Sequence, residues 1–186
     1  AVIALIVVGV IVLAVIIFVI GNYNRLVAVR QHLRDSWSGV DVELKRRYDL
    51  IPNLVEVVKG YAAHERELFE RVAEARARAA ANHGPQDSQA SDENAMLGVL
   101  GRLFAIAEAY PELRSDERYA ELQRQLSLTE DRIAASRRFY NANVREMNQL
   151  RMSFPTNLVG SAFGFHTQRF FELDEAVERV TPRIEL

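Results

Sequence analysis

The sequence predicts an all-α protein, an elongated antiparallel four-helix bundle that follows an N-terminal transmembrane helix. The first observation behind this prediction is that residues 1–21 contain no polar side chain. The second is that apolar residues beyond them recur at alternating intervals of three and four, which places them on one face of an α-helix. The third is that no segment shows the alternating pattern of a strand. Helices packed on helices are then the remaining way to form a core.

The segment from Ala1 to Gly21 is long enough to cross a bilayer as a helix. At about 1.5 Å per residue it spans roughly 30 Å, the thickness of the hydrocarbon core. A cleaved signal peptide has a shorter apolar region of about 7–15 residues and a cleavage site of small residues. A core helix of a soluble protein would keep an amphipathic period, and this run has none. We therefore expect a retained membrane anchor over residues 1–21.

A first bundle helix is expected directly after the anchor. The spacing from Tyr23 to Tyr48 follows a heptad, and no strong helix breaker separates it from the membrane segment. Pro52 is predicted to end or kink this helix and to begin a second one, because proline suits a first helical turn and not a helix interior. The Asp49–Leu54 block would then be a junction at the tip farthest from the bilayer, with Asp49 or Asn53 capping the second helix. A partner-facing surface is the alternative interpretation of this block.

The second helix gives way to a predicted mobile loop at residues 82–92, which combine Gly, Pro, Ser and Asp without an apolar position. Ser91 is predicted to cap a third helix, which Pro111 stops. Ser115 is predicted to cap the fourth and longest helix, and Phe154-Pro155 ends it. The bundle therefore spans residues 22–163. Residues 164–186 form an aromatic C-terminal tail, expected to pack on or beside the bundle.

The composition and the motifs point away from enzyme chemistry. The chain has no cysteine, which excludes disulfides, thiol catalysis and cysteine-based zinc sites. His64-Glu65 begins like the zinc motif H-E-x-x-H, but Leu68 stands where the second histidine belongs. The acidic residues alternate with arginine along helix faces, as solvated ion pairs do. We therefore expect a protein that is not an enzyme, with no catalytic residues, no cofactor, no cofactor-binding residues and no metal site.

Nucleic acid is not an expected partner. The net charge is −2, from 23 Lys+Arg and 25 Asp+Glu. The basic run of Lys45, Arg46 and Arg47 is offset by nearby acids, including Asp41 and Asp49, and it has no interleaved aromatic residues for base stacking.

Two charged residues lie at apolar positions of the predicted helices, Arg30 on the first and Glu65 on the second. A buried charge without a partner costs several kcal/mol, so each should find a partner or reach water. Either they form an ion pair or hydrogen-bond layer in the core, or they mark a ligand site. Thr129, Ser136 and Asn143 recur every seven residues on the fourth helix and could supply the facing polar layer.

The stretch from Tyr23 to Glu65 contains Tyr-Asn-x-Leu-Val, Trp37, Asp-Val-x-Leu-Lys-Arg-Arg, Asp-Leu-Ile-Pro-Asn-Leu-Val and Lys-Gly-Tyr. With these elements the chain resembles the LemA family, and later pieces match as well, at 108–111, 137–141, 154–155 and 163–165. Met147 is a departure, because an aromatic residue is expected there. The positions to which the resemblance and the helical spacing assign a structural or interface role are Tyr23, Asn24, Arg30, Trp37, Asp41, Lys45, Arg46, Arg47, Asp49, Pro52, Asn53, Glu65, Tyr110, Pro111, Tyr140, Asn141, Phe154 and Pro155.

The resemblance implies one membrane helix and an elongated bundle in a bacterial cell membrane, without an established catalytic activity. The first functional hypothesis is a non-catalytic scaffold that self-associates as a homo-oligomer or organises membrane proteins, as in membrane remodelling. The alternative is an adaptor or accessory subunit of a membrane protease or quality-control complex. The expected partners are therefore the lipid bilayer, further copies of the chain and other membrane proteins. Six basic residues within about 25 positions of the anchor favour a cytoplasmic bundle by the positive-inside rule.

Overall fold

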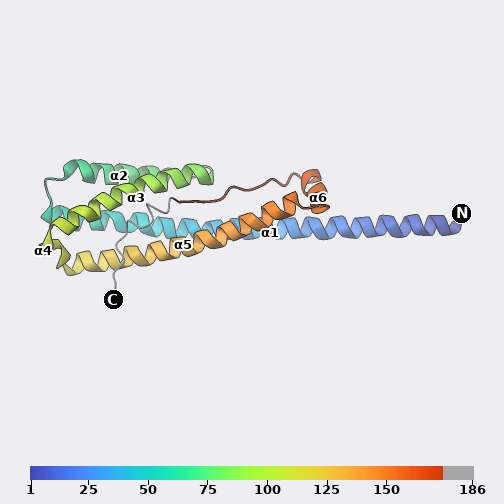
Figure 1. Cartoon of the computed structure of the whole chain (residues 1–186), viewed down its shortest axis with the longest axis horizontal. Helices are drawn as coiled ribbons and strands as arrows, with labels where there is room; N and C mark the ends of the chain where they lie inside the picture. The colour runs from blue at the N-terminus through green and yellow to red at the C-terminus, as the bar shows by residue number, and fades with distance from the viewer. Residues whose placement is uncertain (174–186) are drawn as a thin grey trace.

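The computed structural model describes residues 1–173, and this range contains helices and no strand. The predicted all-α class is confirmed. Successive elements run up and down along one long axis, with a short helix at each end of the fourth long one (Figure 1). The helices are α1 (Val2–Tyr61), α2 (Arg66–Ala81), α3 (Gln86–Ala109), α4 (Pro111–Arg114), α5 (Glu117–Met152) and α6 (Thr156–Ala162).

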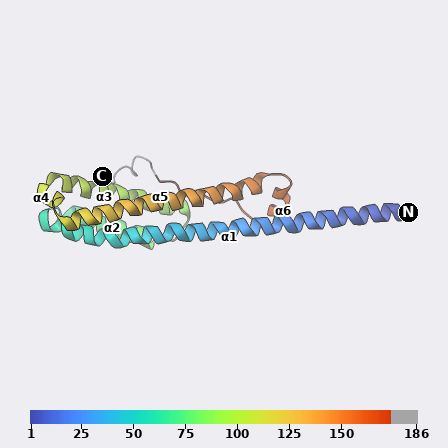
Figure 2. The same ribbon diagram turned by 90° about the horizontal axis from the view of Figure 1, so that it is seen from below.

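Helix α1 is the longest of the described helices. It runs from the N-terminus to the far tip, where α2 turns back beside it, α3 returns to the tip and α4 leads into α5 (Figure 1). Helix α5 then lies along α1 in the opposite direction, and the view from below shows the same pairing (Figure 2). Apolar residues of α1 are buried at intervals of three and four from Leu26 to Val58, so one face of this helix supplies the core.

The first part of α1 projects beyond the bundle. Large apolar side chains from Val2 to Phe18 are all exposed, between 39% at Phe18 and 79% at Ile3. Val19 is the first residue that the bundle partly covers. Helix α1 is long and apolar enough at this end to cross a membrane, and no protein surface shields the apolar part.

Pro52 does not end the first helix, since α1 continues to Tyr61, and that part of the prediction is wrong. Proline has no N–H, so it leaves the carbonyl of Tyr48, four residues earlier, without its helical partner. Arg76 of α2 fills this position, because its Nε donates to the Tyr48 oxygen at 2.5 Å. The neighbouring helix thereby satisfies the group that the proline frees. Asp49 and Asn53 lie exposed inside a helix, so the prediction that this block is a junction where one of them caps a second helix is wrong.

The predicted loop at residues 82–92 is also too long, because α3 already begins at Gln86. The Asn82 side chain accepts from the Gly84 N–H at 2.9 Å and donates to Ser88 at 3.0 Å. The Gln89 side chain donates to the Gly84 carbonyl at 2.7 Å and is itself buried. These polar residues close a short connection and start a helix. Ser91 lies inside that helix and does not cap it.

The cap of α5 is shifted by one residue from the prediction. Asp116, not Ser115, stands at the N-cap, and its Oδ1 accepts from the N–H groups of Arg118 and Tyr119 at 2.8 and 3.1 Å. Tyr61, the last residue of α1, donates to the other oxygen of the same carboxylate at 2.8 Å. This second contact favours the aspartate over the serine, and it ties the end of α1 to the start of α5.

The chain after α6 runs back along the bundle instead of continuing away from it (Figure 1). Phe165, Phe171 and Leu173 are buried there against the helices. The predicted tail extended over residues 164–186, and its part from 174 onwards lies outside the described residues.

Candidate functional site

A fully buried arginine lies at the centre of the bundle. Arg47 of α1 is 0% exposed and binds two carboxylates from two other helices. Its Nη1 donates to both oxygens of Glu130 in α5 at 2.9 Å, and its Nη2 binds Glu93 in α3. Tyr48 donates its hydroxyl to the second oxygen of Glu93. The four side chains, which we call the Arg47 cluster, therefore join α1, α3 and α5 at one level of the bundle.

The electrostatics of the cluster follow from one buried cation facing two acids, of which Glu93 is buried and Glu130 is partly exposed. Burial disfavours the charge of the guanidinium, but Glu130 and Glu93 outweigh it and raise the pKa of Arg47 above its ordinary value. Burial raises the pKa of the Glu93 carboxyl, and Arg47 offsets this only in part. Burial and the charge of Glu93 also raise the pKa of the Tyr48 phenol. The cluster thus favours a charged Arg47. The Glu93 carboxyl binds a proton more tightly than the carboxyl of a solvent-exposed glutamate does.

The sequence contained a signal for this cluster that our interpretation missed. Leu44, Arg47 and Ile51 continue the spacing of the buried face of α1, so Arg47 occupies a core position. Glu93 likewise lies in register with the buried residues Gln89 and Met96 of α3. The sequence analysis places Tyr48 on the apolar face and treats Arg47 as part of a basic run offset by nearby acids, so it does not predict that Arg47 is buried.

The two charged residues that we expected in the core are both at the surface. Arg30 is exposed and lies over the ring of Phe165, with 4.8 Å from its guanidinium carbon to the ring centroid. Glu65 is exposed in the turn before α2. The predicted ion pair or polar layer around them is therefore wrong. Arg30 lies on an exposed face of α1, and Glu65 lies in the turn between α1 and α2.

Thr129, Ser136 and Asn143 of α5 do not form the predicted polar layer. Thr129 is buried and donates to the Gln125 carbonyl of its own helix at 2.8 Å. Ser136 and Asn143 are only half-buried, although the Nδ2 atom of Asn143 is enclosed and has no hydrogen-bond partner.

A second constellation joins motif residues from both ends of the chain. The Trp37 ring packs edge-on against Tyr140 of α5 and Phe171 of the tail, with ring centroids 5.1 and 5.2 Å apart. The Asn141 side chain donates to the Phe171 carbonyl at 3.0 Å and accepts from its N–H at 2.9 Å. The Tyr140 hydroxyl donates to the Arg169 carbonyl at 3.1 Å, and burial raises the pKa of this phenol to about 12. We call these contacts the tail clasp.

The remaining motif residues are spread over the surface or lie at turns. Tyr23 packs on Phe163 and Phe165 of the tail, with centroids 4.9 and 5.9 Å apart. Tyr110 and Pro111 form the corner between α3 and α4, whereas Phe154 and Pro155 form the turn between α5 and α6. The motif residues that are exposed on α1 are Asn24, Asp41, Lys45, Arg46, Asp49, Pro52 and Asn53.

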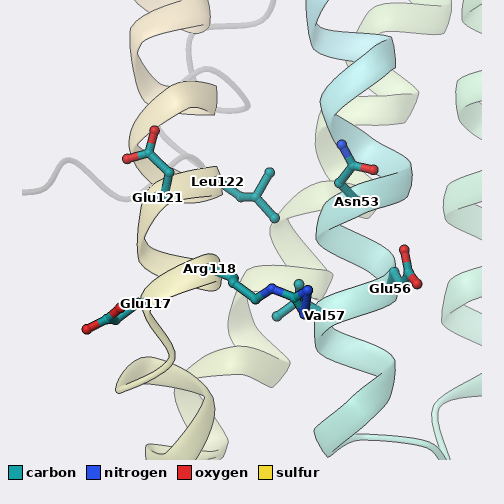
Figure 3. A pocket seen from close by; sticks show the side chains of 7 residues that line it. All are labelled: Asn53, Glu56, Val57, Glu117, Arg118, Glu121 and Leu122. Carbon is teal, nitrogen blue, oxygen red and sulfur yellow. The ribbon is translucent and has the colours of Figure 1, made fainter.

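A surface groove lies near the tip, between α1 and α5, with a volume of about 580 Å³. Figure 3 shows Leu122 and Arg118 reaching from α5 towards α1, while Glu117 and Glu121 point away from it. The groove offers no histidine or other general base at the centre of an enclosed space, and it is open to solvent. Over residues 1–173, no three His, Asp or Glu side chains converge on a point where a metal ion could bind.

The exposed apolar helix, the closed core and the clasped tail define a membrane-associated helical-bundle protein. The chain belongs to the LemA family, whose model matches residues 36–186. The resemblance seen in the motifs is thereby confirmed.

Several relatives match the chain over most of its length. Magnetosome protein MamQ 2 of Paramagnetospirillum magneticum is 28% identical over 203 residues, covering 93% of this chain and 75% of that protein. Magnetosome protein MamQ of Magnetospirillum gryphiswaldense is 27% identical over 190 residues, covering 88% and 70%. Protein LemA of Metamycoplasma hominis is 24% identical over 161 residues, covering 87% and 73%.

Proposed function

We propose that the protein is a non-catalytic scaffold of the bacterial inner membrane, which self-associates or holds other membrane proteins in place. The observation that supports this most is the continuity of α1 from the exposed apolar segment to the far tip. Since a single helix connects the two, the bundle is a stiff rod standing on its anchor. A stiff rod sets a distance from the membrane, which is what a scaffold requires.

The interior of the rod supports a structural role. Arg47 and Glu93 are buried and bind each other, and the partly buried Glu130 binds the same guanidinium, so these charges are paired within the bundle. Confinement to a membrane raises the local concentration of neighbouring copies, so weak lateral contacts between rods act together. The names of the MamQ relatives are compatible with the membrane-remodelling role that the family resemblance implies.

The proposal is tested by the assembly state of the full chain. We expect native mass spectrometry from mild detergent, together with crosslinking in native membranes, to detect homo-oligomers or a defined complex with membrane proteins. A strictly monomeric chain with no crosslinked neighbour would overturn the scaffold. Crosslinks to a membrane protease without any between copies would replace self-association by the adaptor role.

We also propose that the bundle lies on the cytoplasmic side, because basic residues such as Arg25, Arg30 and Arg34 follow the anchor. A C-terminal alkaline phosphatase fusion should then be inactive, while a fluorescent reporter at the same position should be bright. An active phosphatase would place the bundle on the other side.

A further inference from the structure

Large exposed apolar side chains gather at the turn between α5 and α6. Elsewhere on the bundle such residues occur singly, as on most protein surfaces. At this turn they follow one another closely in the chain and crowd one end of the molecule. The members of this group, which we call the apolar turn, are Met152 (75% exposed), Phe154 (79%), Leu158 (60%) and Phe163 (52%).

The apolar turn lies beside α1 at the level where the bundle ends. Thr156 at the start of α6 donates its hydroxyl to the Asn22 side chain at 2.9 Å. The ring of Phe163 packs on Tyr23, with centroids 4.9 Å apart. Both views show α6 against α1 at the end of the bundle that faces the N-terminus (Figures 1 and 2). The last residues of the bundle therefore meet the last residues of the apolar segment.

This level corresponds to the surface of the hydrocarbon core. The uninterrupted apolar run ends at Gly21, and Arg25 is the first charged residue after it. A charged side chain in the hydrocarbon is costly, so the boundary falls between these positions. Tyr23 lies between them, and tyrosine is enriched at membrane interfaces. Because Asn22 and Tyr23 contact α6, the apolar turn lies at the same depth, on the interfacial side of the leaflet.

The fold of the turn holds the apolar side chains outward. The Arg151 guanidinium donates to the Asn157 carbonyl and to the Ser161 hydroxyl, each at 3.2 Å. Its side chain covers Gly160 so closely that a Cβ there would stand 2.8 Å from Arg151 Cδ. Val159 and Gly160 face the protein, whereas Leu158 faces away from it. The turn is therefore a packed structure that leaves its four large apolar side chains exposed.

We propose that the apolar turn is a second membrane contact, which inserts into the phospholipid leaflet where α1 leaves the bilayer. The inference rests on the proposed anchor, because α1 sets the depth. The leaflet is the occupant that the position favours, since the apolar turn continues the apolar surface of the membrane segment at its polar end. Four apolar side chains wedged beside a transmembrane helix widen one leaflet, and two contact points fix the tilt of the rod.

The absence of cysteine allows a direct test by spin labelling of the full chain. Phe154→Cys and Leu158→Cys variants are labelled with a nitroxide and reconstituted into phosphatidylcholine–phosphatidylglycerol vesicles. Collision rates are then measured with oxygen, which is enriched in the bilayer, and with a nickel chelate, which stays in water. At both positions we expect the label to collide more often with oxygen than with the nickel chelate. Phe139→Cys is the matched control, because Phe139 is 63% exposed on α5, roughly 20 Å along the helix from its end at Met152, and collisions with the chelate should dominate there.

An Ile11→Cys variant separates this inference from the anchor on which it rests. If its label collides mainly with oxygen while those at Phe154 and Leu158 match the label at Phe139, the anchor stands and the second contact is overturned. If the label at Ile11 is itself exposed to the chelate, the anchor fails. Labels at the turn that are immobilised and shielded from both reagents would reveal a protein partner and would also overturn the lipid contact. Thermal unfolding of each variant checks that the bundle is intact.

Discussion

At the scale of single residues, the buried Arg47 decides how the helices fit together. A guanidinium with no exposure must bind acids, and both Glu93 and Glu130 are within its reach. Buried ion pairs of this kind contribute little net stability compared with apolar residues, but they penalise any arrangement that separates the partners. The cluster therefore selects one register of α1, α3 and α5 among the several that an apolar heptad pattern would allow.

The first prediction concerns the removal of one partner. Arg47→Met leaves Glu93 buried without its cation, so we expect the free energy of unfolding to fall by about 3–5 kcal/mol. A triple variant, Arg47→Met with Tyr48→Phe and Glu93→Leu, removes the buried polar groups of α1 and α3. It leaves only Glu130, whose side chain is 19% exposed and reaches water, so it should recover most of this loss. Denaturant unfolding in detergent, followed by helical circular dichroism, measures both. Equal losses in the single and triple variants would contradict the account.

The second prediction concerns pH. The pKa of Glu93 is raised in the folded protein, so the proton is bound more tightly there than in the unfolded chain. The resulting stabilisation is complete below the unfolded pKa of about 4.3 and is lost as pH rises through the raised value. Glu93→Gln keeps a neutral side chain at every pH and should lack this loss. The stability of the variant relative to the native chain should therefore increase as pH rises from about 4 to neutrality. A difference that does not change with pH would contradict the raised pKa.

At the scale of elements, α2 supports α1 at its weakest point. Pro52 interrupts the hydrogen-bond ladder of α1, and the Arg76 side chain replaces the missing donor. The motif around Pro52 therefore works with a residue in the next helix. This explains why the block lies inside a helix and away from any junction.

The third prediction is a double-mutant cycle between these two residues. Arg76→Met removes a charged donor from the Tyr48 carbonyl, and we expect it to cost about 1.5–3 kcal/mol. With Pro52→Ala, the new backbone N–H can bind the same carbonyl, so the arginine is less needed. The cost of Arg76→Met should then fall by at least about 1 kcal/mol. The same cost in both backgrounds would show that Arg76 acts elsewhere.

At the scale of the whole molecule, the tip is farther from the anchor than the sequence suggested. We predicted a tip at Asp49–Leu54, about 45 Å from the bilayer, whereas α1 ends at Tyr61. From Gly21 to Tyr61 a helix spans about 60 Å. The tip and the membrane contact are therefore at opposite ends of one rod.

The fourth prediction measures this rod. Nitroxide labels at Asn24→Cys and Gly60→Cys lie at exposed positions of α1, with no atom within 4 Å of a Cβ at Gly60. Dipolar spectroscopy should give a narrow distance distribution near about 54 Å, from the rise of an unbroken helix. A hinge at Pro52 would shorten and broaden it. The control pair Asn24→Cys with Lys45→Cys lies wholly before Pro52, at about 32 Å, and should be narrow in either case.

Local patterns in the sequence were sufficient to predict the all-α class of the fold. The apolar segment, the helical spacing and the breaks at Pro111 and Pro155 depend on the residues nearby, and the structure has helices that end at Ala109 and Met152, shortly before those prolines. The relevance of Trp37, Tyr140 and Asn141 could be anticipated from the motifs, but the segment that they hold could not. Phe171 reaches them only because the tail folds back along the bundle.

By itself, the sequence determined that this protein has an apolar N-terminal segment long enough to cross a membrane, followed by long amphipathic helices, because chain-local hydrophobicity governs both. Only the tertiary structure decided which polar residues are buried. Arg47, Arg30 and Glu65 all occupy positions that the helical spacing allows in a core, and only Arg47 has carboxylates from two other helices within reach. The continuity of α1 through Pro52 was decided in the same way, by an arginine on α2. A buried charge, or a carbonyl that has lost its helical donor, is stable only with a hydrogen-bond partner. Partners far apart in the chain meet only after the helices have packed.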